Sequence, residues 1–482
     1  MSETLNKQVK NATKWSAITE IAAKLVTPVT TMVLARLLAP EAFGVLVTAT
    51  LVISFAEIFT DAGFQKYIIQ NKFEDDESLF RSSTVAFWTN LGLSLFLWAI
   101  FAIFSPQIAR MMGEEKHSLV IAVSCVCIPI AAFSSIQMAI YKRFFDFRTL
   151  FVVRIAGILV PLIITIPIAY FTRSYWSLIV GMIAQNLLNA IILTAKSRWK
   201  PTMFYSCDLF KSMFSFTSWS LIEAISIWFT SYIDVFFVGS ILSTYYMGIY
   251  RTSIGTVGQI MNLIIAATTP VLFSALSRLQ DNPDEFKLMF LRFQKIVGLL
   301  VVPIGVGIFL FSDTITNILL GDQWTEASGF IGWWGLTSSV TIILSHYSSE
   351  IYRSLGKPKL SVLAQCLHLV VLIPVVLIAI QHGFETLYIS RSLIRFQMIL
   401  VNAIIIYNLI HISFWKMMNN IKGSLTGSVA MVAIWLILPS SNSLAIQILY
   451  VCLCSITYIA TICIFSEERN ILLNLKSILK KK

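Results

Sequence analysis

The chain has 482 residues, of which 57% are hydrophobic and 13% are charged, and its mean hydropathy is +0.78. Soluble globular domains are about half apolar and about a quarter charged, so this composition excludes a water-soluble protein and indicates a polytopic membrane protein. The net charge of +11 is divided among short basic clusters between apolar stretches. That distribution is typical of membrane topology and argues against a nucleic-acid partner.

Apolar stretches long enough to cross a bilayer, roughly 20 residues each, follow one another from Trp15 to the neighbourhood of Ser466. Backbone groups in lipid must be hydrogen-bonded within the protein, and the sequence lacks the even alternation of barrel strands, so we expect helices. We predict an all-α polytopic membrane protein with fourteen transmembrane helices, centred near residues 26, 54, 93, 127, 161, 185, 226, 260, 303, 340, 369, 396, 432 and 455.

The basic residues predict the orientation of these helices, because loops rich in Lys and Arg stay on the cytoplasmic side. With the N-terminus inside, 27 of the 36 Lys and Arg residues fall in inner segments, whereas the outer loops hold only Arg36, Arg110, Lys116 and Arg173. We therefore expect both termini to be cytoplasmic. The outer loops are too short for a separate catalytic domain.

The sequence contains an internal repeat. KWSAITEI (14–21) aligns with SWSLIEAI (218–225), and at the same offset LARLLAPEAFGVL (34–46) aligns with VGSILSTYYMGIY (238–250). At a slightly larger offset, IYKRFFDFRTLFVV (140–153) resembles IYRSLGKPKLSVLA (351–364). The alignment indicates two homologous halves of six helices, both entering from the cytoplasm. Parallel repeats of this kind are typical of transporters that bind their substrate between the halves and alternate access.

This repeat predicts the domain organisation. We expect an N-terminal lobe over residues 1–200 (helices 1–6) and a C-terminal lobe over residues 201–412 (helices 7–12), which surround a central cavity with pseudo-symmetry. Residues 413–482 supply helices 13 and 14 and a basic cytoplasmic tail, and they have no counterpart in the first lobe.

The segments KWSAI (14–18), LARLLAPEAFGVLVTATLVISFAEIFTDAGFQKYIIQ (34–70) and YKRFFDFRTLFVVRIAG (141–157) resemble the polysaccharide and O-antigen flippases. These proteins belong to the multidrug, oligosaccharidyl-lipid and polysaccharide exporter superfamily. The resemblance covers helices 1 to 12 and implies a bacterial cytoplasmic-membrane transporter without a cofactor. The implied cargo is an oligosaccharide on undecaprenyl diphosphate, which is flipped for O-antigen, capsule or exopolysaccharide assembly. Polymerase and glycosyltransferase neighbours and coupling to H⁺ or Na⁺ are further implied.

Ionisable side chains inside spans are costly and usually face a bundle interior or a water-filled cavity. The candidates for a substrate cavity are Lys24, Arg251, Asn262, Arg391 and Arg395. Arginine suits a diphosphate because its planar fork binds phosphate oxygens with two hydrogen bonds and stays charged. Arg391 and Arg395 share a helix face without an acid nearby on their own helix, which favours the cavity interpretation for this pair.

Five carboxylates in predicted spans are candidates for ion coupling: Glu20, Glu57, Asp61, Glu223 and Asp234. An embedded carboxylate can exchange a proton or bind sodium at physiological pH. The alternative is that these acids neutralise buried Lys or Arg; Glu20 and Lys24, for example, have the favourable i, i+4 order. Both interpretations stay open, and the sequence does not specify the ion.

Other functions are less compatible with the sequence. It contains no P-loop for ATP, no HExxH or GxSxG motif, and no cysteine spacing typical of a zinc site, so we expect no enzyme, no catalytic residues and no metal. A membrane enzyme of glycan assembly is the least favoured alternative. A peptidoglycan-precursor flippase and a multidrug exporter of the same superfamily remain alternatives, and fourteen helices favour the former of these two.

Overall fold

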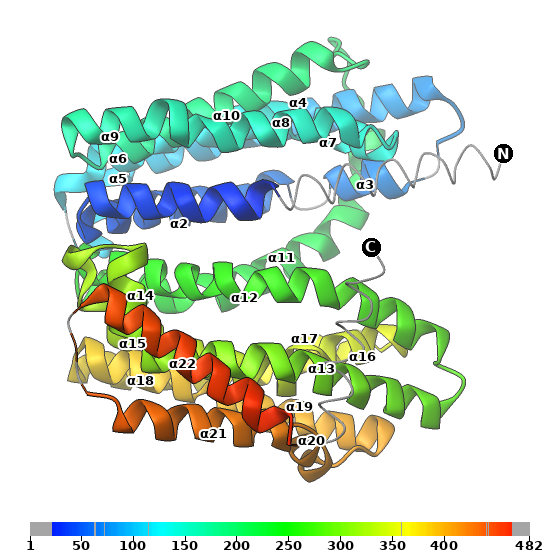
Figure 1. Cartoon of the computed structure of the whole chain (residues 1–482). Coiled ribbons are helices and arrows are strands. Elements are labelled where there is room, and N and C mark those ends of the chain that lie inside the picture. Colours follow the sequence, from blue (N-terminus) through cyan, green and yellow to red (C-terminus); the bar gives the residue numbers. More distant parts are fainter. Residues whose placement is uncertain are drawn as a thin grey trace. The chain divides into compact units, whose positions relative to one another are not determined.

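A computed structural model describes residues 22–464 apart from 62, 63, 72, 114, 358, 440 and 442, and it covers all side chains in these ranges except those of residues 61, 66, 70, 115, 215–220, 222, 223 and 226. Within the described ranges the regular structure is entirely helical, as Figure 1 shows. The predicted all-α class is therefore confirmed.

The described chain divides into two compact units, one up to Arg251 and one from Thr252 onwards. The first unit comprises a helix over residues 22–37 and then α2 (Pro40–Asp61), α3 (Phe64–Gln70), α4 (Asp76–Ile103), α5 (Ser105–Met111), α6 (Ser118–Ser124), α7 (Cys127–Arg143), α8 (Phe147–Val160), a π-helical turn (Pro161–Thr165), α9 (Ile166–Thr172), α10 (Trp176–Lys196), α11 (Cys207–Ile241) and the start of α12 (Thr244–Arg278).

The second unit contains the rest of α12 and the helices that follow it. These are α13 (Pro283–Leu310), α14 (Ser312–Leu319), α15 (Ala327–Thr341), a π-helical turn (Ile342–His346), α16 (Ser348–Ser354), α17 (Lys359–Ala379), α18 (Phe384–Leu393), α19 (Arg395–Ile410), α20 (Phe414–Asn420), α21 (Lys422–Ile437) and α22 (Leu444–Ile462). Short 3₁₀ turns lie at Glu115–His117, Asp322–Trp324 and Ile380–His382.

Eleven helical segments in the described ranges are long and apolar enough to cross a membrane, and a twelfth is obtained if α20 and α21, which meet at a bend of 59°, form one span. The predicted spans near residues 26 and 226 coincide with the helix over 22–37 and with α11, both of which adjoin or include residues outside the description. The multi-helix membrane fold is confirmed, and the count of fourteen stays a prediction.

Local signals in the sequence set several helix ends. The side chain of Asp75 accepts a hydrogen bond from the Ser78 amide at 2.7 Å and so caps α4, while the Ser78 hydroxyl lies 3.4 Å from the Asp75 amide. Asn282 caps α13, and Pro283 occupies the first turn, where its missing N–H costs no hydrogen bond. These caps satisfy amides of the first turn that have no partner within the helix.

Within the first unit, α7 packs against α4 and α10, and α10 packs against α8 (Figure 1). Within the second unit, α13 crosses α15 at small residues. A side-chain carbon placed on Gly305 would lie 2.2 Å from the Ser339 hydroxyl oxygen and 2.9 Å from the Gly335 carbonyl oxygen. The hydrophobic effect does not hold helices together inside lipid, so such close backbone contact is a main source of their attraction.

The internal repeat is visible in the backbone. The break before α2 ends at Pro40 and the break before α12 ends at Thr244, two positions that the first alignment of the repeat makes equivalent. In the second alignment, the Asp146 amide donates to the Tyr141 carbonyl at 2.9 Å, and the Lys357 amide donates to the Tyr352 carbonyl at 2.7 Å. The same turn therefore follows α7 and α16 at equivalent positions of the two halves.

One residue in each of these turns has a left-handed backbone: Phe145 with φ 56° and Gly356 with φ 68°. Glycine adopts this conformation at little cost, whereas a residue with a side chain loses about 1–2 kcal/mol. The first unit therefore keeps this turn although Phe145 is less suited than glycine to a left-handed backbone.

Candidate functional site

Four of the charged residues singled out in the sequence lie in two side-chain clusters, one inside each unit. The cluster of the second unit contains Arg391 and Arg395, and the cluster of the first contains Arg251 and Asp234.

In the second unit, the two arginines lie against one indole ring. The guanidinium carbon of Arg395 is 4.1 Å from the centroid of the Trp334 ring, and that of Arg391 is 5.2 Å from it. Trp334 comes from α15 and is buried, whereas the arginines are half-buried and belong to α18 and α19, which meet at a turn at Ile394. The electron-rich indole face attracts cations, and this attraction is strongest where water is scarce.

Arg395 is held further by a hydroxyl group. Its Nη1 donates to Oγ of the buried Ser338 at 2.6 Å, one helical turn after Trp334 on α15. Among the residues that the structure describes, Arg395 makes no ion pair. The guanidinium is therefore stabilised by a ring and a neutral hydroxyl, and its positive charge remains available to an anion.

A polar network lies two turns further along α19. The Asn402 amide nitrogen donates to Ser345 Oγ at 2.8 Å, and its oxygen accepts from the Tyr352 hydroxyl at 2.7 Å. All three side chains are buried. The network ties α19 to α16 and to the π-helical turn after α15, and so fixes the helices that carry Arg395 and Trp334.

In the first unit, an aromatic ladder connects α2, α11 and α12. The Trp228 indole N–H donates to Ser54 Oγ at 3.0 Å, and its ring stacks on Tyr232 at 5.5 Å between centroids. The guanidinium carbon of Arg251 lies 5.0 Å from the centroid of the Tyr232 ring. Each unit thus places an arginine predicted from the sequence on an aromatic ring.

Asp234 lies deep in the first unit with 3% of its surface exposed. Its Oδ2 accepts from the hydroxyl of the fully buried Tyr250 at 2.9 Å. Tyr250 precedes Arg251 on α12, so the carboxylate and the guanidinium are placed by adjacent residues of one helix. The buried carboxylate of α11 is thus joined to α12 by the Tyr250 hydroxyl.

The other predicted residues do not join these clusters through any contact described for them. Lys24 and Glu57 are half-buried on the helix over 22–37 and on α2, and Asn262 is exposed on α12; each has interactions of its own. Glu20 lies outside the described residues, and the side chains of Asp61 and Glu223 lie outside the description as well. In the described ranges no three His, Cys, Asp or Glu side chains lie close enough together to hold a metal ion.

The sequence interpretation missed the aromatic partners of these charges. Trp334, Trp228 and Tyr232 read as ordinary apolar residues of their spans. A signal was present in the first unit, where Trp228 and Tyr232 are four residues apart and so share a helix face. For Trp334 the sequence has no comparable signal, because Arg391 comes much later in the chain and only the packing of α15 against α18 joins them.

Comparison with known proteins shows the family of this chain. A family model described as "Polysaccharide biosynthesis protein" matches residues 33–329, more than half of the chain. The chain belongs to this family. The match begins in the helix over 22–37 and ends in α15, so it includes the cluster of the first unit and stops before Trp334.

Two relatives of this family member come from bacteria. An "Uncharacterized membrane protein in cps region" of Klebsiella pneumoniae is 24% identical over 66% of this chain and 65% of its own length. The "Lipopolysaccharide biosynthesis protein WzxC" of Escherichia coli K12 is 20% identical over 67% of this chain and 65% of its own length. The chain thus matches slightly less than two thirds of each relative.

A solved structure titled "Lipid II flippase MurJ, inward closed conformation" has the same fold. It superposes with a TM-score of 0.73 at 15% sequence identity, over 94% of this chain and 98% of that one. The family match confirms the expected polysaccharide family, and the superposition shows that the chain has the fold of this structure. The names of these proteins refer to polysaccharide or lipopolysaccharide biosynthesis, to a membrane protein and to a flippase.

Proposed function

We propose that this family member is a flippase that moves an undecaprenyl-diphosphate-linked oligosaccharide across the bacterial cytoplasmic membrane for O-antigen, capsule or exopolysaccharide assembly. The family description and the names of the two relatives support a role in surface polysaccharide assembly. The observation that carries the proposal is the pair Arg391 and Arg395 on Trp334, two half-buried cations on one ring, of which Arg395 makes no ion pair within the described residues.

The chemistry of this pair fits the proposed cargo. A guanidinium fork binds phosphate oxygens with two parallel hydrogen bonds, and Arg395 keeps donors beyond the one that Ser338 accepts. Contact with the Trp334 ring restricts where the two guanidinium groups can lie, and a preorganised group loses less entropy on binding. We infer that the diphosphate is held at Arg391 and Arg395 of the second unit.

Alternating access between two lobes, over residues 1–200 and 201–412, is the mechanism that the internal repeat favours. We further propose that Asp234 and Tyr250 form an ion-responsive pair: proton or cation binding at Asp234 alters the Tyr250 hydrogen bond at the start of α12. That helix also carries Arg251, a predicted substrate-cavity residue, directly after Tyr250. Both termini are proposed to lie in the cytoplasm, as the basic loops indicate.

The test uses a strain whose own copy of this gene is deleted. The wild-type gene is expected to restore surface polysaccharide, whereas Arg391→Ala with Arg395→Ala is expected to abolish it while the protein stays in the membrane at normal amount. Lipid-linked repeat units should accumulate on the inner leaflet. Normal polymer in the double variant would refute the assignment of these two arginines.

The two alternatives from the same superfamily are separated by parallel assays. A peptidoglycan-precursor flippase would rescue growth of cells depleted of their lipid II flippase, and a drug exporter would raise resistance to cationic drugs. We expect neither effect. Rescue or resistance without restored polysaccharide would overturn the proposed cargo class.

A further inference from the structure

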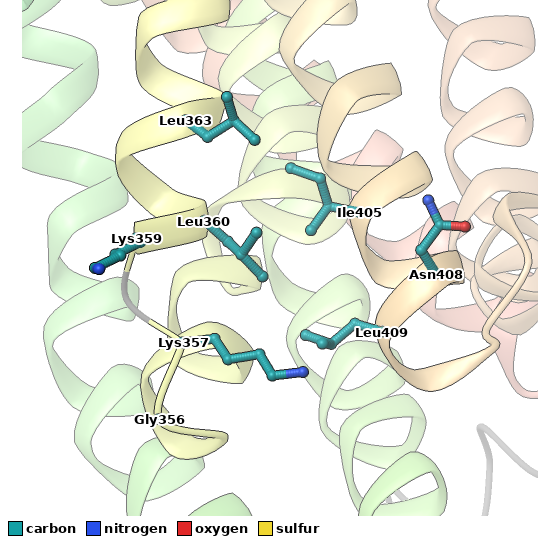
Figure 2. A pocket seen from close by; sticks show the side chains of 8 residues that line it. All are labelled: Gly356, Lys357, Lys359, Leu360, Leu363, Ile405, Asn408 and Leu409. Atoms are coloured by element: carbon teal, nitrogen blue, oxygen red, sulfur yellow. The ribbon is translucent and has the colours of Figure 1, made fainter.

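A cavity in the second unit lies apart from the arginine pair. It has a volume of about 770 Å³ and opens between the start of α17 and the end of α19, as Figure 2 shows. Leu360 and Leu363 form one wall, and Ile405 and Leu409 form the other. The walls are therefore apolar over about one to two helical turns.

Polar groups occupy one end of this cavity. Lys357 and Lys359 flank its entrance on the α17 side, and Asn408 lies on the α19 side. In Figure 2 the Lys357 side chain extends toward Leu409, while Lys359 points away from the cavity. Among the described residues, none of these three side chains has a hydrogen-bond or ion-pair partner.

The repeat shows that the fold does not require a lysine here. The residue equivalent to Lys357 in the first unit is Asp146, whose carboxylate accepts from the Thr149 amide at 3.1 Å and from its hydroxyl at 2.9 Å, and so caps α8. A lysine cannot accept such hydrogen bonds, so the second unit lacks this cap and carries a cation instead. The turn itself is unchanged, because both backbones make the same hydrogen bond.

We propose that this cavity binds an anionic phospholipid of the inner leaflet, with the phosphate at Lys357 and Asn408 and an acyl chain between Leu363 and Ile405. Three features support this occupant: a cation and an amide without partners among the described residues, apolar walls that continue from them, and exposed apolar side chains such as Val370 (70%) further along α17. The basic-loop pattern puts this turn at the cytoplasmic surface, where anionic lipids attract lysines.

Lipid binding to the purified full-length protein in detergent tests the proposal, with bound lipids counted by native mass spectrometry. Dioleoyl phosphatidylglycerol is compared with dioleoyl phosphatidylcholine. The variant Lys357→Gln with Lys359→Gln is expected to lose about fivefold in affinity for phosphatidylglycerol, because only Lys357 extends into the cavity. The matched control, Lys416→Gln with Lys422→Gln, removes two lysines that do not line the cavity and should bind like the wild type.

Two further arms identify the site and the lipid. Leu363→Trp keeps both lysines and fills the cavity at a half-exposed position, so it should also weaken phosphatidylglycerol binding. Undecaprenyl phosphate serves as a probe of the polyprenyl cargo. The proposal is overturned if either the lysine variant or Leu363→Trp binds phosphatidylglycerol as tightly as the wild type does. It is also overturned if the lysine-dependent site binds undecaprenyl phosphate and does not bind phosphatidylglycerol. Polysaccharide export by the lysine variant is read separately, so failure here leaves the flippase proposal standing.

Discussion

Gly44 and Gly248, which the repeat aligns with each other, pack against each other's helix in a reciprocal contact. A side-chain carbon on Gly44 would lie 1.9 Å from the Thr244 carbonyl oxygen, and one on Gly248 would lie 2.0 Å from the Pro40 carbonyl oxygen. Pro40 and Thr244 are themselves aligned by the same offset. The N-terminal ends of α2 and α12 thus cross with local two-fold symmetry inside the first unit.

This contact predicts that neither glycine tolerates a methyl group. Gly44→Ala or Gly248→Ala would place a carbon against backbone, which cannot rotate away, and we expect a loss of about 1–3 kcal/mol in the free energy of unfolding. The thermal midpoint of the protein in detergent measures the loss. Gly255→Ala on α12 is the control, because no atom lies within 4 Å of the added carbon; alanine is favourable in a helix, so this variant should be neutral or stabilising. Equal midpoints for all three variants would contradict the reciprocal contact.

Arg395→Lys is expected to reduce polysaccharide export about tenfold although it preserves the charge. An ammonium group lacks the flat face that lies 4.1 Å from the Trp334 ring centroid and cannot donate to Ser338 and a phosphate with the same fork. A cation–π contact shielded from water is worth about 2 kcal/mol. Export is measured as surface polymer per amount of membrane protein. The control is Arg154→Lys on α8, which changes an exposed arginine and should leave export normal. Normal export by Arg395→Lys as well would show that contact of the guanidinium with the Trp334 ring is not needed for export.

Tyr250→Phe is expected to destabilise the protein by about 1–3 kcal/mol, because it removes the donor at 2.9 Å from a buried Asp234 oxygen. Tyr170→Phe, at a position 63% exposed, serves as the control for loss of a hydroxyl. Asp234→Asn keeps an acceptor for Tyr250 and should fold, while transport in membrane vesicles should lose its dependence on the ion gradient. A gradient dependence unchanged in Asp234→Asn would exclude this residue from ion coupling.

The cap of α4 predicts a pH-dependent contribution outside the spans. The hydrogen bond from the Ser78 amide holds the pKa of Asp75 below its ordinary value. A lowered folded-state pKa means that the cap stabilises the protein above the unfolded-state pKa, about 3.9, and that this effect is lost as the pH falls through the folded-state value. Asp75→Ala should therefore lower the thermal midpoint at pH 7, and the difference from the wild type should shrink at pH 3. Glu74→Ala, next to the cap, should show no such difference at either pH.

The equivalent turns that begin at Tyr141 and Tyr352 show what could be predicted from the sequence. The alignment of 140–153 with 351–364 predicted equivalent structure, and the two turns have the same backbone hydrogen bonds. The positions of the spans could also be predicted from the sequence, because a long apolar stretch in lipid must form a helix to satisfy its backbone hydrogen bonds.

The side chains that contact the two arginines and Asp234 could not be predicted from the sequence. Arg391 and Arg395 were expected to share a face, and both lie against Trp334, but nothing in the sequence pointed to a ring on another helix. The choice of partner depends on how α15 packs against α18 and α19. Likewise, the sequence did not separate Asp234 from the four other candidate acids. What distinguishes it is the hydrogen bond from the buried Tyr250 hydroxyl. Such pairings depend on tertiary packing, which periodicity does not encode.

The placement of Trp334 also has a consequence for biogenesis. An arginine at the centre of a membrane helix costs about 2.5–3.5 kcal/mol during insertion, and α18 and α19 bring two of them close together. Because α15 precedes these helices in the chain, the indole ring and the Ser338 hydroxyl are synthesised before either arginine leaves the ribosome. The stabilising partners are thus made first, so that a segment with two arginines enters the bilayer after the helix that can bind them.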